Sequence, residues 1–124
     1  MWYLGENTKE YEGGVVVSTA GSWEHGVDGA SAGVTMPANP QLGQAYREEY
    51  RAGQAEDQAA VLSVDEQAQV PAGHFKDVVL AKGFTPLHRR VLEYKLYSPG
   101  VGPVLMFGVS GGSDVERLVS FEVT

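Results

Sequence analysis

The chain contains no cysteine. This absence excludes disulfide bonds, thiolate catalysis and cysteine-bound zinc, but it leaves the redox compartment open. No run of the sequence approaches the 18 or so apolar residues of a membrane-spanning helix, so no membrane span is expected. The first residues, Met1–Glu10, have neither the basic region nor the apolar core of an export signal. We therefore expect no signal within the chain as given.

Positive charge is also scarce. Nine lysines and arginines stand against sixteen aspartates and glutamates, which gives a formal net charge of −7. Nucleic-acid binding needs a cationic surface that releases counterions from phosphates, so this balance argues against nucleic acid as a partner. Anionic lipid headgroups would repel the chain for the same reason.

Glycine, by contrast, is abundant, with sixteen residues in a chain of 124. Many glycines predict many turns, which favours an all-β protein. Leu92, Tyr94 and Leu96 alternate with polar neighbours, and this period of two is typical of a strand with one apolar face. The segments Val15–Thr19 and Phe75–Phe84 are rich in β-branched or aromatic residues and are also predicted to be strands. Further alternating stretches are Tyr46–Arg51 and Val119–Val123.

A helix is plausible only in Gln44–Leu62, where helix-forming residues are common. Gly53 interrupts that segment and no apolar stripe of period 3.6 persists, so we expect two strands joined by a turn. The sequence thus predicts one all-β domain over residues 1–124. We expect an antiparallel meander of seven or eight strands that forms a curved half-barrel or a small barrel.

Turn signals separate the predicted strands. Gly13-Gly14 and Gly111-Gly112 fit short hairpin loops, which need positive φ at the centre. In the stretch Ser98–Pro103, Pro99 lacks the N–H that would continue a ladder, so this stretch predicts a sharp corner between two strands. The glycine-rich segment Gly26–Gly43 has little periodicity and is predicted to be a long surface loop or a flap.

Three histidines are enough in number for a zinc or copper site. None forms a closely spaced metal-binding pair, and pairing of Phe75–Phe84 with Arg90–Tyr97 would separate two of them by on the order of 30 Å at ~3.3 Å per residue. We therefore predict independent surface or rim histidines, with no metal and no cofactor. They are His25, His74 and His88.

The motif Gly-x-Ser-x-Gly, which forms the nucleophile elbow of some hydrolases, occurs around Ser31 and around Ser110. The copy at Ser110 leads into an alternating strand and is predicted to be a hairpin turn. The copy at Ser31 has acidic residues and His25 nearby, the residue types of a hydrolytic triad, although sequence separation says nothing of geometry. Three carboxylate pairs are predicted to be solvated turns: Glu24 with Asp28, Glu56 with Asp57, and Asp65 with Glu66.

Aromatic side chains offer a different kind of site. They could pack in the core or on a sheet face, or they could line an apolar cleft on a curved sheet. We predict that five of them line such an apolar cleft and bind a ligand: Trp23, Tyr46, Tyr50, Tyr94 and Tyr97.

Four phrases, "WYLGENTKEYEGGVVVSTAGSWEHGVDGA", "MPANPQLGQAYREEYRAGQAEDQAAVLSV", "FKDVVLAKGFTPL" and "EYKLYSPGVGPVL", lie within residues 1–107. They resemble an uncharacterised family of bacterial extracytoplasmic proteins, often actinobacterial, in which a similar corner ends a strand. The matching positions are the corner residues Tyr97, Pro99, Gly100, Val101 and Gly102 together with Trp23, Glu24, Asp28 and Gly29. The resemblance implies a secreted or periplasmic β-rich protein with no named activity.

The chain departs from that family in two ways. Its three histidines stand where other residues are expected, so a histidine-based function would be peculiar to this chain. Members of the family look longer, and this chain corresponds to their C-terminal half. An unpaired sheet edge would follow, and such an edge invites pairing with a second copy, so we expect a homodimer.

These features together predict an extracytoplasmic binding module that holds a small apolar or amphipathic ligand on a concave, aromatic-lined sheet. The alternative is a small hydrolase or metal-dependent enzyme built on Trp23–Gly33 with one or more of the histidines. A third class, a structural or partner-binding protein without a small ligand, also fits the sequence.

Overall fold

The computed structural model describes residues 1–123 and contains strands but no helix over that range. The all-β prediction is therefore confirmed. The twelve strands in chain order are β1 (Trp2–Tyr3), β2 (Gly5–Glu6), β3 (Glu10–Glu12), β4 (Val15–Ser18), β5 (Trp23–Glu24), β6 (Gly33–Val34), β7 (Ala45–Arg47), β8 (Gln58–Val70), β9 (Gly73–Phe84), β10 (Leu92–Ser98), β11 (Gly102–Ser110) and β12 (Val115–Arg117). Since residues 1–123 contain no helix, none of them forms one that could cross a membrane.

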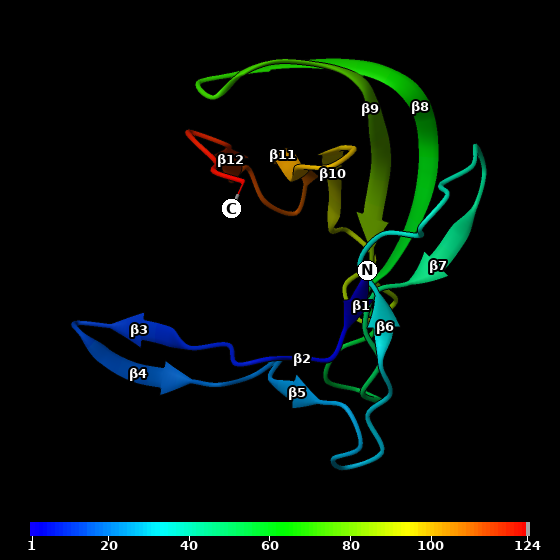
Figure 1. Cartoon of the computed structure of the whole chain (residues 1–124). Coiled ribbons are helices and arrows are strands. Elements are labelled where there is room, and N and C mark those ends of the chain that lie inside the picture. The colour runs from blue at the N-terminus through cyan, green and yellow to red at the C-terminus, as the bar shows by residue number, and fades with distance from the viewer. Residues whose placement is uncertain (124) are drawn as a thin grey trace.

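The main sheet is an antiparallel meander of six strands in the order β12-β11-β10-β9-β8-β7. The expected count of seven or eight strands in one meander is not confirmed, and no closed barrel is found among residues 1–123. The remaining strands form three two-stranded sheets, β1-β6, β2-β5 and β3-β4. Figure 1 shows β8 and β9 bending over β10, β11 and β12.

The bend of the main sheet has a local cause in the pairing of β8 with β9. The pairing of β8 with β9 shifts register three times, between Val61 and Ser63, between Ser63 and Glu66, and between Glu66 and Ala68. Each shift places an extra residue in one strand, which bends that strand and increases its twist. The long hairpin consequently arches over its neighbours.

The inside of this arch is filled by the protein's own side chains. Ala68, Val78, Leu96 and Val104 are buried together, and partly buried side chains such as Phe107 pack against them. The N–H of Leu118 donates to the carbonyl of Val104, and the carbonyl of Leu118 accepts from Ala72 at the tip of the arch. The chain after β12 thus connects β11 to the tip of the β8–β9 hairpin.

The same contacts explain why one strand prediction is wrong. The alternation in Val119–Val123 predicted a strand that would include these residues, but β12 ends at Arg117. The N–H of Leu118 still bonds Val104 of β11, but its carbonyl accepts from Ala72 in the turn between β8 and β9. The apolar residues that follow do not continue the ladder, although Phe121 packs its ring 6.2 Å from that of Phe75.

The predicted turns are confirmed where glycine requires them. Gly13 and Gly14 have φ of 58° and 81° and join β3 to β4. In the Ser98–Pro103 corner, β10 ends at Ser98 and β11 begins at Gly102, whose φ is 112°. The N–H of Val101 donates to the carbonyl of Ser98 and closes the turn.

The expected loop Gly26–Gly43 is attached to the rest of the protein at several points. It contains β6, whose Val34 pairs with Trp2 of β1. Ser31 donates through its N–H to the carbonyl of Tyr50, and Gly43 donates to that of Val61. Likewise the segment Gln44–Leu62 forms β7 and the start of β8 with a turn between them, as predicted.

Candidate functional site

The five predicted ligand-binding aromatics do not gather on one surface. Tyr46 and Tyr97 belong to one buried cluster with Met36, Val61 and Val79. Trp23 lies in another, where its ring meets that of Tyr3 at 5.2 Å and 80°. These two clusters account for three of the five residues.

The other two aromatics lie apart from both clusters. Tyr94 packs edge-on against Phe107, with ring centroids 5.6 Å apart. Tyr50 lies under the guanidinium of Arg47, whose central carbon is 4.2 Å from the ring centre. Only Tyr46 and Tyr97, of the predicted set, share a cluster.

The residues of the predicted hydrolase have other partners. The Nδ1 atom of His25 accepts a hydrogen bond from the N–H of Ala32 at 3.0 Å. Asp28 forms an ion pair with Arg51 at 3.2 Å. Ser31 forms an isolated bridge with Tyr50. The contacts of these side chains therefore do not include a hydrogen bond from Ser31 to His25.

The other two histidines, His74 and His88, have separate surroundings. The ring nitrogens of His74 hydrogen-bond to Gln69 and Gln67, at 3.1 and 2.8 Å. His88 is exposed in the turn after β9. Throughout residues 1–123, no group of three or more histidine, aspartate or glutamate side chains is arranged to hold a metal ion.

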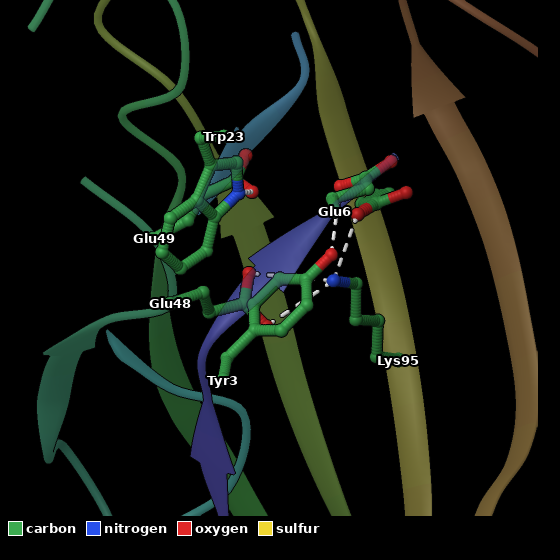
Figure 2. A network of polar contacts seen from close by, with 7 residues as sticks. Tyr3, Glu6, Trp23, Glu48, Glu49 and Lys95 are labelled. Atoms are coloured by element: carbon green, nitrogen blue, oxygen red, sulfur yellow. Dashed lines mark hydrogen bonds and ion pairs between the residues drawn. The ribbon is translucent and has the colours of Figure 1, made fainter. Parts of the chain in front are cut away.

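A cluster of polar side chains lies elsewhere, where Tyr3 of β1 and Trp23 of β5 lie close to Lys95 of the main sheet (Figure 2). Lys95 of β10 forms an ion pair with Glu48, with Nζ 3.2 and 3.3 Å from the two carboxylate oxygens. Lys95 also pairs with Glu93 at 3.2 Å. Glu48 and Glu49 are only 4% and 7% exposed, which is rare for glutamate.

The carboxylate of Glu49 has other partners than that of Glu48. Its Oε2 atom accepts a hydrogen bond from the indole N–H of Trp23 at 2.7 Å. Nearby, the hydroxyl of Tyr3 donates to Glu6 at 2.7 Å. Figure 2 shows Glu49 beside Trp23 and Glu6 near the ammonium of Lys95. We name this set the carboxylate cluster; its members are Glu6, Glu48, Glu49, Asp57, Glu93 and Lys95.

The backbone explains why two consecutive glutamates are buried. After β7 ends at Arg47, the N–H groups of Glu48 and Glu49 both donate to the carbonyl of Asp57, at 2.9 and 3.3 Å. This turns the chain inward. A side chain at Gly33 would collide with the carbonyl of Glu48, so only glycine lets β6 approach this closely. Gly83 similarly leaves space for the side chain of Glu93 on the neighbouring strand.

Burial dominates the electrostatics of the cluster. It raises the pKa of Glu49 to about 7, and the negative charge of Asp57 adds to the effect. Burial also raises the pKa of Glu48, with Lys95 offsetting only part of the shift. The pKa of Asp57 is raised by burial too, although Lys95 and a hydrogen bond with Thr85 act in the opposite direction.

Burial acts on the pKa of Lys95 in the opposite direction. Loss of water would lower its pKa, but the adjacent carboxylates Glu48 and Glu93 outweigh that effect and raise it. Burial likewise raises the pKa of Tyr3 and of Tyr97. Lys95 is therefore a fixed positive charge at neutral pH, whereas Glu49 changes protonation there.

Two cavities have Tyr97 in common, and one of them contains the cluster. One, of about 380 Å³, is lined by the carboxylate cluster together with Tyr3, Thr35, Tyr97, Pro103 and Met106. The other, of about 530 Å³, is mainly apolar and is lined by Met1, Met36, Pro37, Ala38, Pro40, Val79, Tyr97 and the corner residues Ser98–Gly102. We name them the carboxylate cavity and the apolar cavity. Tyr97 lines both.

Sequence reasoning missed the carboxylate cluster. In "YREEY" the two glutamates look like part of an alternating exposed strand, and Asp57 was predicted to be in a solvated turn. One signal was present: Glu93 and Lys95 are two apart in a strand and so share a face. Nothing local indicated that Glu48 would meet that face. Compared with known proteins, the chain matches no protein family, no curated protein and no solved structure.

Proposed function

We propose that this protein is a binding module whose apolar cavity holds the hydrocarbon part of a small amphipathic ligand. The observation that supports this proposal is the volume and chemistry of that cavity. At about 530 Å³ it lies in the range of small-molecule sites, and its walls include Met36, Val79 and Tyr97. Methionine adapts to irregular apolar shapes, which suits a flexible chain.

The Ser98–Gly102 corner provides a fixed wall of this cavity. Its backbone is held by the pairing of Tyr97 with Pro103 and of Ser98 with Gly102. The opposite wall comes from residues 36–40 of the predicted flap, of which Met36 is buried. In this proposal residues 36–40 cover the ligand on the face of the bent sheet that lies opposite the arch.

The proposed site differs in position from the one expected from the sequence. The concave face under the arch is filled by Val78, Leu96 and Val104. Tyr97 alternates with Leu96 along β10 and so faces the other side of the sheet. Of the predicted aromatics, Tyr97 lines the apolar cavity and Tyr46 packs behind it, whereas Trp23, Tyr50 and Tyr94 have no part in the proposal.

A neutral apolar probe tests this function. We expect Nile red to gain fluorescence with the protein and to be displaced by 1-octanol. Ala38→Trp would fill the cavity mouth and should weaken octanol binding about tenfold or more. Ala52→Trp, an exposed alanine of the turn that ends in Ala55 and not a cavity residue, is the matched control and should bind normally. Equal binding by the two variants, or no displacement, would overturn the proposal.

We also propose that two copies associate through the β3–β4 hairpin. This hairpin extends away from the main sheet (Figure 1), and Tyr11, Val15 and Val17 on it are 61%, 65% and 53% exposed. An isolated two-stranded hairpin is marginally stable, and β4 carries no charge that would discourage pairing. Sedimentation should show a reversible dimer that Val16→Lys weakens; a monomer at all concentrations would contradict this. The extracytoplasmic location remains a proposal that rests on the resemblance in residues 1–107.

A further inference from the structure

We propose that the carboxyl groups of Glu49 and Asp57 form a pH-sensitive switch that controls access to the apolar cavity. While the two groups share a proton, strands β1, β2, β5 and β6 stay packed against residues 48–57. When the proton leaves, these four strands loosen and the cavity opens. This inference rests on the proposed function and adds to it the regulation of that cavity.

The first supporting feature is the contact between the two carboxyl groups, since the side chains of Glu49 and Asp57 hydrogen-bond to each other. An ionised carboxylate can only accept, so a hydrogen bond between two carboxyl groups requires a proton on one of them. The backbone keeps the two residues together, because the N–H of Glu49 donates to the carbonyl of Asp57 at 3.3 Å. Glu49 is almost fully buried, so removal of the proton would leave two adjacent negative charges where ionisation is costly.

The surroundings of the pair do not neutralise a second negative charge. The charged and titratable groups that face it are Glu6 on β2, Tyr3 on β1, Glu48 in the same turn, and Glu93 and Lys95 on β10. Lys95 is the cation of this set, and two glutamates already engage it. Burial raises the pKa of Glu49 to about 7, with the charge of Asp57 adding to the shift and the indole of Trp23 opposing it. The shared proton is therefore lost near neutral pH.

Glu49 connects this pair to the short N-terminal strands. Its Oε2 atom accepts from the indole of Trp23 in β5, and the ring of Trp23 packs against that of Tyr3 in β1. Strands β1, β2, β5 and β6 have two residues each, and each pairing between them joins two residues to two. Elements with so few backbone pairs lie at the low-stability end of a structure, from which moving lids are drawn. A charge that develops at Glu49 would act first on these strands.

The same strands lead to the wall of the apolar cavity. Strand β1 pairs with β6, and just beyond this pairing the N–H of Thr35 donates to the carbonyl of Met1 at 2.9 Å. Met1 immediately precedes β1 and Met36 follows β6 by two residues, and both line the apolar cavity. Loosening of β1 and β6 would therefore move this wall and let a bound ligand leave.

Hydrogen–deuterium exchange of the full chain at pH 6 and pH 8 tests the switch. Loss of one proton from a group with a pKa of about 7 changes the opening equilibrium about tenfold over this interval. After correction for the intrinsic pH dependence of exchange, we expect the amides of residues 23–35 to exchange about tenfold faster at pH 8, while those of β9 and β10 stay protected. Equal protection of residues 23–35 at both pH values would overturn the inference.

A pair of variants assigns the response to Glu49. In Glu49→Gln the amide can donate to Asp57 and its oxygen can accept from Trp23, so the contacts remain without a titrating proton. We expect E49Q to stay protected at pH 8. Glu24→Gln, which removes an exposed carboxylate from β5, is the matched control and should respond to pH as the parent protein does. A response in E49Q as large as in the parent would also overturn the inference.

Release of a neutral probe tests the connection to the cavity. We expect Nile red, chased with excess 1-octanol, to dissociate about tenfold faster at pH 8 than at pH 6 from the parent protein and from E24Q. From E49Q it should dissociate equally slowly at both pH values. If Nile red does not bind, the proposed function itself fails, and exchange still decides whether the switch exists. If it binds and leaves the parent protein at the same rate at both pH values, the function stands and the inference about regulation is overturned.

Discussion

The two faces of strand β10 differ sharply in chemistry. On one face, Leu96 is buried under the arch of β8 and β9, and Tyr94 packs against Phe107. On the other face, Lys95 binds two carboxylates and Tyr97 lines two cavities. The first face contributes to stability by close packing. The second is covered by short strands that leave space and buried charge, and it is there that we place the proposed ligand.

The largest expected effect comes from removing the charge at the centre of the second face. Lys95→Met leaves Glu48 buried without a partner, and we expect it to lower the free energy of unfolding by about 3–5 kcal/mol at pH 8. Urea denaturation measures this directly. Lys82→Met on the neighbouring strand is the control and should change stability by about 0.5 kcal/mol or less.

The loss should be smaller at pH 5, because Glu48 can then be protonated, and burial already raises its pKa. A Lys95 variant as stable as the Lys82 variant at pH 8 would show that the ion pair contributes nothing, and the two faces would then not differ in this respect.

A smaller effect on stability is expected from replacing Gly33, the glycine that lets β6 approach Glu48. In Gly33→Ala the new methyl group collides with the carbonyl of Glu48, so the strand must shift. We expect a loss of about 1–3 kcal/mol in the free energy of unfolding. Gly112→Ala meets no atom within 4 Å and should be nearly neutral. Thermal unfolding of both variants decides the point; equal melting temperatures would mean that the close approach is not needed.

The pH dependence of stability should also differ between the faces. Glu49 has a pKa of about 7 in the folded protein, above its ordinary value of 4.5. A protonated Glu49 places no charge in the interior, so its contribution to the stability of the fold is fully present below about pH 4.5. This contribution is lost as the pH rises through 7. The free energy of unfolding should therefore fall over that window, by at most about 1.4 kcal/mol per pH unit for this group.

Replacing the titrating group isolates its share of that slope. Glu49→Gln should flatten the dependence between pH 5 and pH 7 and raise the stability at pH 8. The control is Glu116→Gln on exposed β12, which should follow the parent protein. If E49Q and the parent protein have the same slope, the carboxyl group of Glu49 does not titrate in this window.

The smallest expected effect distinguishes the two tyrosines of β10. Tyr97→Phe keeps the ring but removes the hydroxyl of a residue that lines the apolar cavity, and we expect 1-octanol to bind about fivefold more weakly, the equivalent of one hydrogen bond of about 1 kcal/mol. Tyr94→Phe, on the opposite face, should bind normally. Calorimetry of both variants measures the difference, and a larger loss in the Tyr94 variant would reverse our assignment of the faces.

Much of the fold could be predicted because its signals are local. The period of two around Tyr94, the paired glycines at Gly13-Gly14 and the corner at Pro99 each concern a few consecutive residues. The second half of β8 could not be predicted this way, since Ser63–Gln67 is largely polar. Its strand conformation depends on pairing with β9, and such tertiary context overrides intrinsic preference.

The site was harder to predict because its members come from distant parts of the chain. The contact between Glu48 and Lys95 joins residues 47 apart in sequence. Whether Glu48 is exposed or buried depends on where β7 ends, and the alternation of "YREEY" suggested a strand longer than the three residues observed. Tyr97 was selected for its type and its neighbours, and it does line a cavity, but on the face opposite to the filled concave surface.

The bonds of Leu118 have a consequence for how the protein is made. The β8–β9 hairpin is complete once Phe84 has left the ribosome, but the hydrogen bonds of Leu118 that connect the tip of its arch to β11 form only later. Until β10 and β11 emerge and bring Leu96 and Val104, the apolar underside of the hairpin stays open to other nascent chains and to chaperones. The growing chain thus passes through an interval of exposure, which ends when β10 and β11 cover the underside and Leu118 connects the tip to β11.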